Sequence, residues 1–182
     1  MVCPVITDEN SRTVTLPSGK WTDIWTGEII KGPLQFRKET PLETIPVYLR
    51  EGAVIPLRLN QNLRFGESMT NNMVQALMIT LPEKEQETEW ICGQNLQASV
   101  MIARKADGFD ISLQNMLEIL YLIVCDQNIT EVKIDGKPLP QLKEKELDTL
   151  PPGWFYDMEM KRTIVRLPRG LSKNVELKLT EI

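Results

Sequence analysis

The chain has 182 residues, of which 42% are hydrophobic and 25% are charged, a composition typical of folded globular proteins. Its 25 acidic and 21 basic residues give a net charge of −4, so no broad basic surface for nucleic acid is expected. A membrane-spanning helix needs about 20 consecutive apolar residues, and the longest apolar run, Ile119 to Cys125, is much shorter. We therefore expect neither a nucleic-acid partner nor a membrane partner.

Two absences exclude several kinds of active site and metal site. The chain has no histidine, which removes histidine-based triads, histidine metal ligands and the usual proton shuttle. Cys3, Cys92 and Cys125 lie far apart, so they cannot form a Cys-x-x-Cys motif. We predict no metal site and no cofactor. The odd cysteine count and the lack of a basic, signal-like start at Met1 to Ile6 predict a cytoplasmic location.

Alternation of apolar and polar residues predicts short strands in the first half of the chain. The strand with Val14 and Leu16 is expected to stop at Pro17-Ser18-Gly19, and Arg50-Glu51-Gly52 is expected to form a turn. The alternating sets are, in chain order, Val14 and Leu16; Ile45, Val47 and Leu49; Ile55, Leu57 and Leu59; Leu77, Ile79 and Leu81.

The same alternation continues to the C-terminus. Ile119 to Val124 predicts a fully buried strand after a turn or bulge near Asn115, although Leu113, Met116, Leu117 and Leu120 also have helical spacing. Asp135-Gly136 predicts a hairpin turn, and Lys161-Arg162 a second tight turn. Further alternating sets are Phe109, Ile111 and Leu113; Val132 and Ile134; Trp154, Tyr156, Met158 and Met160; Thr163, Val165 and Leu167; Val175, Leu177 and Leu179.

Strands that recur about every ten residues predict an all-β fold of the sandwich type. We expect two tandem antiparallel β-sandwich domains, residues 1–66 and 67–182. The polar, turn-rich stretch from Asn60 to Asn72 is interpreted as the linker between them, and Gln141 to Asp148 as a loop or a short helical turn.

Two motifs near the N-terminus resemble a known family. They are Leu16-Pro17-Ser18-Gly19-Lys20-Trp21-Thr22-Asp23-Ile24-Trp25-Thr26-Gly27 and Pro41-Leu42-Glu43-Thr44-Ile45-Pro46-Val47-Tyr48-Leu49-Arg50-Glu51-Gly52-Ala53-Val54-Ile55-Pro56. In this order they resemble the region that follows the catalytic barrel in glycoside hydrolase family 31, which contains α-glucosidases and α-xylosidases. Ile134 to Leu139 and Gly153 to Asp157 are similar, more weakly, to the distal C-terminal β-sandwich of that family.

The resemblance implies that residues 1–66 are the proximal and residues 67–182 the distal C-terminal β-sandwich of such an enzyme, without its catalytic barrel. The two catalytic aspartates of the family lie on barrel loops, and no position of this chain matches their motifs. The resemblance therefore implies no catalytic residue here. It implies a parent enzyme that hydrolyses α-glycosidic bonds with retention, whose barrel is the partner of this chain.

Acidic residues of this chain are also catalytic candidates on their own. Retaining glycosidases need two carboxyl groups about 5–5.5 Å apart. The candidate groups lie in polar stretches with no apolar pocket to raise a pKa, so a solvated charged surface is the favoured interpretation. They are Asp8 and Glu9; Glu83, Glu85, Glu87 and Glu89; Glu144, Glu146 and Asp148.

The four tryptophans and one arginine could bind sugar or a carboxylate. Trp21 and Trp25 would share one side of a strand, and core packing is favoured for both; alternate rings of Trp154-Phe155-Tyr156 are expected to enter the distal core. Trp90 lies among charged residues and is expected to be partly exposed. For Arg50, covering a sheet edge beside a glycine turn is favoured over gripping a carboxylate.

Three functions follow from the sequence. The first is a non-catalytic support for the barrel of a parent α-glucosidase-like hydrolase, in which case this chain alone is inactive. The second is a stand-alone carbohydrate-binding module, and the third is a docking domain that self-associates or binds a partner subunit. Glycan binding separates the second from the first, and an exposed apolar patch favours the third.

Overall fold

The computed structural model describes residues 1–5, 10–41, 44–65, 73–92, 96–116, 119–125, 129–143, 152–170 and 172–179. Within these ranges the chain forms strands and turns and no helix, so no helix there could cross a membrane. The all-β prediction is confirmed. The strands are β1 (Ser11–Asp23), β2 (Ile29–Glu39), β3 (Tyr48–Arg50), β4 (Val54–Asn60), β5 (Met73–Thr80), β6 (Gln86–Cys92), β7 (Leu96–Arg104), β8 (Gly108–Gln114), β9 (Ile119–Cys125), β10 (Ile129–Ile134), β11 (Lys137–Pro138), β12 (Gly153–Asp157), β13 (Arg162–Arg166) and β14 (Lys173–Leu179).

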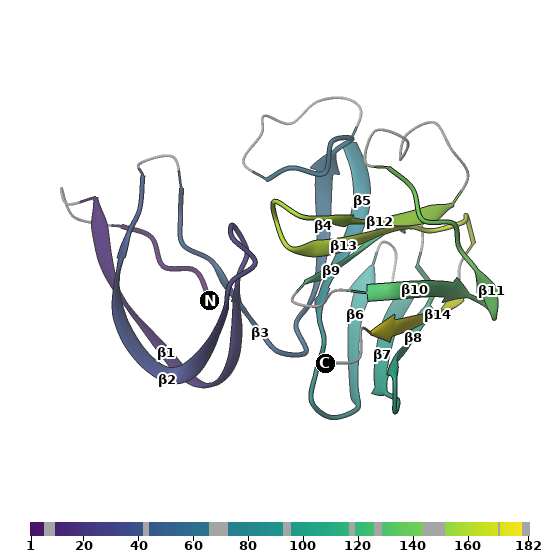
Figure 1. Cartoon of the computed structure of the whole chain (residues 1–182), viewed down its shortest axis with the longest axis horizontal. Helices are drawn as coiled ribbons and strands as arrows, with labels where there is room; N and C mark the ends of the chain where they lie inside the picture. Colours follow the sequence, from purple (N-terminus) through teal and green to yellow (C-terminus); the bar gives the residue numbers. More distant parts are fainter. Residues whose placement is uncertain are drawn as a thin grey trace.

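The first three strands form a separate sheet in the order β2-β1-β3, and its long β1–β2 hairpin bends into a U (Figure 1). The expected stop at Pro17-Ser18-Gly19 is wrong, because β1 continues to Asp23. The register shifts between Leu16 and Gly19, so two residues of β1 lie opposite one of β2, which is a β-bulge. A Cβ added at Gly32 would lie 1.9 Å from the carbonyl oxygen of Pro17, so the bend depends on close backbone contact.

We call this sheet, together with the first five residues, the N-terminal unit. Met1 to Val5 run antiparallel to residues 46–48: the amide of Cys3 donates to the Pro46 carbonyl at 2.8 Å, and the amide of Tyr48 to the Met1 carbonyl at 2.8 Å. The core of the unit is small: in the part of it that the structure describes, five apolar or aromatic side chains are buried. They are Cys3, Val14, Leu16, Trp21 and Tyr48, with Ile30 and Phe36 packed against them.

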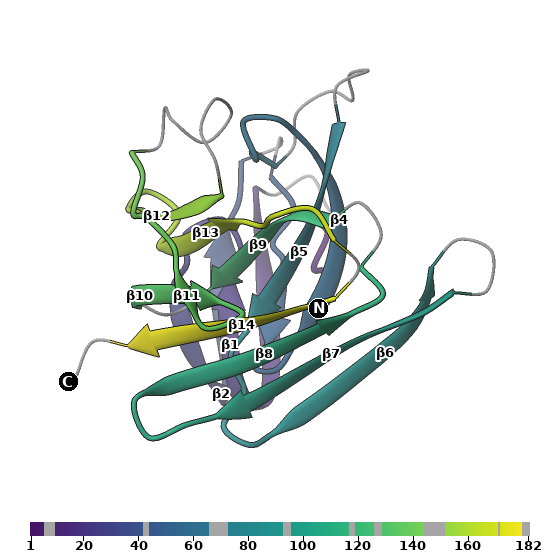
Figure 2. The same cartoon turned by 90° about the vertical axis from the view of Figure 1, so that its right-hand side faces the viewer.

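The remaining strands form two sheets that face each other (Figure 2). The six-stranded sheet has the order β11-β10-β14-β8-β7-β6, and the five-stranded sheet the order β12-β13-β9-β5-β4. The chain leaves the five-stranded sheet after β5, builds β6, β7 and β8 in the other sheet, and returns as β9. Because of this crossover β9 pairs with β5 in parallel, whereas the other paired strands of these two sheets are antiparallel.

The sheet pairings cross the sequence position where two domains were expected to meet. β4 pairs with β5 in antiparallel register from Val54–Ile79 to Asn60–Met73, so residues 54–60 share a sheet with the C-terminal part of the chain. The segment between these strands therefore connects neighbours in one sheet. The division into residues 1–66 and 67–182 stays a prediction, and residues 66–72 lie outside the described ranges.

The inner strands of the five-stranded sheet, such as β9 and β13, are buried on both faces. Leu122, Val124 and Val165 point between the two sheets, whereas Ile123 and Ile164, their chain neighbours, belong to a second apolar cluster on the opposite face. That second cluster includes Leu49 from β3 and Leu63 from the segment after β4. This double burial explains why β9 has an almost continuous apolar sequence, as expected for a buried strand.

Several turns were predicted correctly. Asp135 and Gly136 have φ of 50° and 74° and join β10 to β11, and Asn115 has φ of 56° just before β9. Lys161, with φ of 48°, closes the turn between β12 and β13. The expected shared strand face of Trp154, Tyr156, Met158 and Met160 is wrong beyond Tyr156, because β12 ends at Asp157.

Double burial of the five-stranded sheet predicts that both faces contribute equally to stability. Leu122→Ala and Ile123→Ala should each lower the free energy of unfolding by about 2–5 kcal/mol, because each leaves a cavity at a fully buried position. Ser112→Ala, on a less buried site of the six-stranded sheet, should change it by less than about 0.5 kcal/mol. Urea denaturation measures all three values. A near-neutral Ile123→Ala would show that the second face is open to water.

Tyr48 is a fully buried aromatic residue in the core of the N-terminal unit. Its hydroxyl oxygen has no hydrogen-bond partner. Burial, followed by the negative charge of Asp23, raises the pKa of Tyr48 from 10.0 to about 12. A raised pKa in the folded state contributes stability below the unfolded pKa, and this contribution is lost as pH rises through the folded pKa. Stability should therefore fall between pH 10 and about 12.

The variant Tyr48→Phe tests this directly. At neutral pH it should change the free energy of unfolding by less than about 1 kcal/mol, because the removed hydroxyl makes no hydrogen bond. In alkaline titration followed by tyrosine absorbance and circular dichroism, the variant should unfold at a higher pH than the wild-type protein. Equal alkaline midpoints for the two proteins would contradict this account of Tyr48.

Candidate functional site

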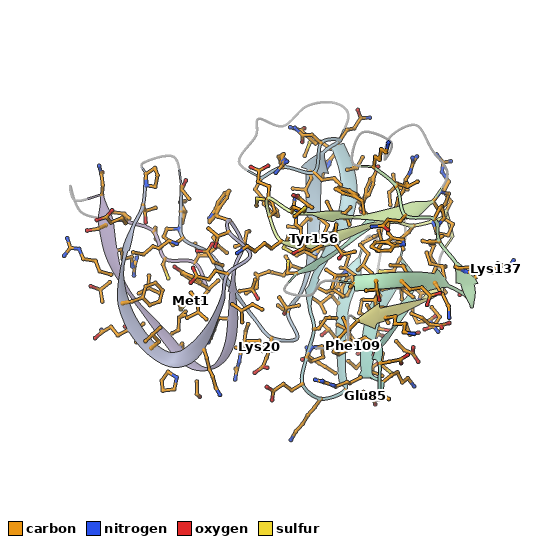
Figure 3. The ribbon with its side chains drawn as sticks, viewed as in Figure 1. Met1, Lys20, Glu85, Phe109, Lys137 and Tyr156 are labelled. Carbon is orange, nitrogen blue, oxygen red and sulfur yellow. The ribbon has the colours of Figure 1, made fainter. Side chains whose placement is uncertain are left out.

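The acidic candidates that the structure describes lie on the surface of the six-stranded sheet. Glu83, Glu85, Glu87 and Glu89 are all exposed on or just before β6, which is the edge strand of the six-stranded sheet. Figure 3 shows Glu85 at the end of the sandwich away from Tyr156. Charged side chains on an edge strand discourage pairing with another chain, so this series acts as protection of the edge. The remaining candidates lie outside the described ranges; they are Asp8, Glu9, Glu144, Glu146 and Asp148.

Two of the four tryptophans are core residues. Trp21 is 7% exposed in the N-terminal unit, and its indole Nε1 donates to the carbonyl of Pro17 at 2.9 Å. Trp154 is 3% exposed between the two large sheets, and Phe155 enters the cluster on the opposite face. Neither ring can stack on a sugar.

The other two tryptophans are half-buried. β1 ends at Asp23, so Trp25 lies in the following turn and not on the same strand as Trp21, contrary to expectation. Its Nε1 donates to the carbonyl of Ile45 at 2.7 Å, and its ring meets Phe65 edge-on at 6.0 Å. Trp90 is half-buried as expected, and it packs against the core between the large sheets.

Arg50 lies at the end of β3, beside two glycines. Its side chain lies over Gly19, since a Cβ added there would be 3.4 Å from the Arg50 Nε. The carbonyl of Arg50 accepts from the amide of Ala53 at 3.0 Å and from Oγ1 of Thr80 at 2.6 Å, which closes the turn at Glu51-Gly52. These contacts agree with the interpretation of Arg50 as a residue at a sheet edge beside a glycine turn.

The main polar cluster was not predicted from the sequence. Asp157 ends β12 and Arg162 begins β13, and the two residues pair across this hairpin. Arg162 Nε donates to Asp157 Oδ2 at 3.2 Å, and Arg162 Nη2 donates to the carbonyl of Leu63 at 2.9 Å. Burial lowers the pKa of Arg162, and the charge of Asp157 opposes that shift. The sequence indicates this cluster only through the opposite charges of Asp157 and Arg162, which flank the predicted turn between two strands.

Two more residues extend this cluster toward solvent. Arg64 Nη2 lies 3.0 Å from Glu159 Oε2 and Arg64 Nη1 lies 4.0 Å from Asp157 Oδ2. Glu159 is largely exposed, so its pair with Arg64 adds little stability. Asp157 Oδ1 accepts from the amides of Glu159 and Met160, both at 3.1 Å. Since both oxygens of Asp157 are occupied by protein donors, this carboxylate holds the turn and is not available to a substrate.

The other buried charged groups are also occupied. Asp23 is fully buried; its Oδ2 accepts from Lys38 Nζ and its Oδ1 from the amide of Trp25, each at 2.9 Å. Burial lowers the pKa of Lys173, with Asp135 opposing, and Lys173 Nζ donates to the carbonyl of Gly170 at 2.6 Å. These contacts stabilise turns.

Two of the surface hollows formed by described residues are large enough to consider as binding sites. One, of about 120 Å³, lies on the six-stranded sheet and contains the ion pairs Lys105–Asp110 at 3.1 Å and Lys178–Asp107 at 3.9 Å. The other, of about 480 Å³, is a polar hollow at the open end of the β1–β2 hairpin, lined by residues such as Arg37 and Thr40. Neither is lined by an exposed aromatic ring, and no three described acidic or cysteine residues converge as metal ligands.

Comparison with known proteins agrees with the motifs near the N-terminus. Residues 1–55 match the family model of the glycosyl hydrolase family 31 C-terminal domain. The chain is 43% identical over 68 residues to an α-glucosidase of Saccharolobus solfataricus; that match covers 37% of this chain and 9% of the enzyme.

Solved structures match over nearly the whole chain. A cycloalternan-forming enzyme of Listeria monocytogenes aligns with a TM-score of 0.84 at 19% identity, covering 97% of this chain and 18% of the enzyme. A family 31 dextranase of Flavobacterium johnsoniae aligns with a TM-score of 0.76 at 17% identity, covering 97% of this chain and 25% of the enzyme. The chain thus spans a small part of each protein that it matches. Over residues 1–55 the chain resembles the glycosyl hydrolase family 31 C-terminal domain in sequence, and over nearly its whole length it shares the fold of a part of these enzymes.

Proposed function

We propose that this chain is the non-catalytic C-terminal region of an α-glucosidase-like enzyme, where it supports the catalytic barrel of a parent that hydrolyses α-glycosidic bonds with retention. The observation that carries this proposal is the match of residues 1–55 to the family 31 C-terminal domain. The buried carboxylates of Asp23 and Asp157 support it, because each is fully used by donors of the protein itself.

An exposed apolar strip offers a surface for the barrel. Val2 and Val47 form an isolated antiparallel bridge, so Val2, Pro4 and Ile45 point to the same side of this pair of segments, by the alternation of extended chain. All three are exposed, Val2 by 62% and Ile45 by 48%, whereas Cys3 and Pro46 between them are buried. We call Val2, Pro4 and Ile45 the outer apolar strip. Covering such a strip with another protein surface is favourable.

The pure chain should show no hydrolysis of p-nitrophenyl α-glucoside or p-nitrophenyl α-xyloside above a protein-free blank. The physical reason is that the resemblance places the two catalytic aspartates on barrel loops outside this chain, and the buried carboxylates of Asp23 and Asp157 are already paired with the protein's own donors. Release of p-nitrophenol is followed by absorbance. Turnover that persists through purification would contradict the proposal. Saturable sugar binding without turnover, lost in Trp90→Ala, would favour a carbohydrate-binding module instead.

The outer apolar strip should make the isolated chain self-associate. Replacing Val2 and Ile45 together by lysine should shift the protein toward monomer in sedimentation velocity, because the exposed apolar area is replaced by charge. The matched control is Thr13→Lys with Thr15→Lys, on exposed positions of β1, which should leave self-association unchanged. Equal sedimentation of wild-type protein and the strip variant would remove this surface as the docking site.

The cytoplasmic location belongs to the same proposal, and fractionation of the host cell tests it.

A further inference from the structure

The N-terminal unit and the sandwich meet through three turns that are far apart in the sequence. These are the turn at residues 24–27 after β1, the segment at residues 61–65 after β4, and the turn at residues 158–161 between β12 and β13. Figure 1 shows the β12–β13 turn reaching toward the end of the β1–β2 hairpin. The covalent connection through β3 and β4 is thus not the only link between the two parts.

The contact begins at a buried cation in the sandwich. The Arg162 side chain is only 2% exposed. Its Nε donates to Asp157 on its own hairpin, and its Nη2 donates to the Leu63 carbonyl on the segment after β4. Arg162 and Leu63 are 99 residues apart in the chain. A buried charge that loses one partner costs far more than an exposed one, so this arginine fixes the position of Leu63 firmly.

Phe65 continues the contact to the N-terminal unit. The guanidinium carbon of Arg162 lies 5.2 Å from the centroid of the Phe65 ring, which is cation–π distance. The Phe65 ring in turn meets the Trp25 ring edge-on, at 6.0 Å and 82°. Trp25 is held in place by its bonds to Asp23 and to the carbonyl of Ile45. A continuous series of contacts therefore joins β1 to β13.

The turn at residues 24–27 and the turn at residues 158–161 also touch each other directly. Gly27 has φ of 64°, and a Cβ added there would lie 2.6 Å from the carbonyl oxygen of Met160 and 2.7 Å from Cβ of Lys161. Only a residue without a side chain fits between the turns in this arrangement. The relative position of the two parts is consequently fixed at a second point.

The N-terminal unit needs such support more than the sandwich does. Among the described residues, its core has five buried side chains, against 21 in the cluster between the two large sheets. A three-stranded sheet with so small a core is marginally stable in water unless it packs against another element.

We propose that Trp25, Phe65, Arg162 and Asp157 form a clasp that locks the N-terminal unit to the sandwich and supplies part of its stability. The clasp makes the family-matched residues 1–55 dependent on the C-terminal sandwich. This inference goes beyond the proposed function, because it concerns the chain itself and holds with or without a catalytic partner.

Hydrogen exchange of the amides of β1 and β2 tests the clasp, because their ladder bonds lie wholly within the N-terminal unit. In Phe65→Ala these amides should exchange about tenfold faster than in the wild-type protein, since opening of the unit becomes easier. Arg162→Met should have the same effect. Trypsin cleavage after Arg64, measured on the same variants by mass spectrometry, should accelerate as the segment at residues 61–65 is released.

Two matched controls separate the clasp from general destabilisation. Arg104→Met, on β7, removes an arginine whose guanidinium carbon lies 5.8 Å from the centroid of the Phe109 ring. Ile111→Val removes one methyl group from the core between the large sheets. Both should leave exchange in β1 and β2 within about twofold of wild type. If Arg162→Met does not fold, hydrogen exchange in Phe65→Ala alone tests the clasp. Unchanged exchange in folded Phe65→Ala, or equal acceleration in Ile111→Val, would overturn the proposal.

Discussion

Burial of the five-stranded sheet on both of its faces is the constraint on which the rest of the structure depends. One face packs against the six-stranded sheet, and the apolar cluster on the other face is covered by residues from outside the two large sheets. Leu49 from β3 and Leu63 from the segment after β4 supply part of that cover. The N-terminal unit is therefore positioned by the same apolar surface that would otherwise be exposed, and the hydrophobic effect drives the packing of the two parts as well as the folding of each.

Apolar burial alone does not fix an orientation, because it is non-directional. The directional groups at this junction are the Arg162–Asp157 pair, the backbone contact at Gly27, and the hydrogen bonds of Thr80 and Gln86 to the turn at residues 50–53. A buried ion pair contributes little net stability, since desolvation offsets most of the attraction, but breaking it is costly. The junction thus combines an apolar surface that stabilises contact with polar groups that allow one geometry.

The parts of the fold that were predictable are those set by local sequence. Alternation identified β8, β10 and β14, and Asp135-Gly136 identified the hairpin after β10, because a strand's period and a turn's backbone angles depend on a few adjacent residues. The sequence predicted a strand end where β1 has a bulge. Proline and glycine are typical of both, and only the pairing with the partner strand distinguishes a bulge from a strand end. The parallel pairing of β5 with β9 has no local signal at all.

The polar cluster around Arg162 was missed for the same reason. One of the two partners of Arg162, the Leu63 carbonyl, comes from a residue 99 positions away, and an arginine near a predicted turn is ordinarily exposed. For the candidates that the sequence did indicate, the predicted exposure agrees with the structure. Trp21 and Trp154 are buried, Trp90 is half-buried, and the glutamates of β6 face solvent. Residue type and neighbours indicate whether a side chain is buried, but they do not indicate which distant group it meets.

The state of the buried polar groups bears on what the chain does. A catalytic or binding site presents polar atoms whose partners in the resting protein are water or substrate, held in a cleft. Here the buried carboxylates of Asp23 and Asp157 point at the protein's own amides and cations, at the ends of hairpins. Groups used in this way hold turns at fixed positions, which is what a scaffold requires. The outer apolar strip of Val2, Pro4 and Ile45 is exposed, and it is the surface that we propose for contact with a partner.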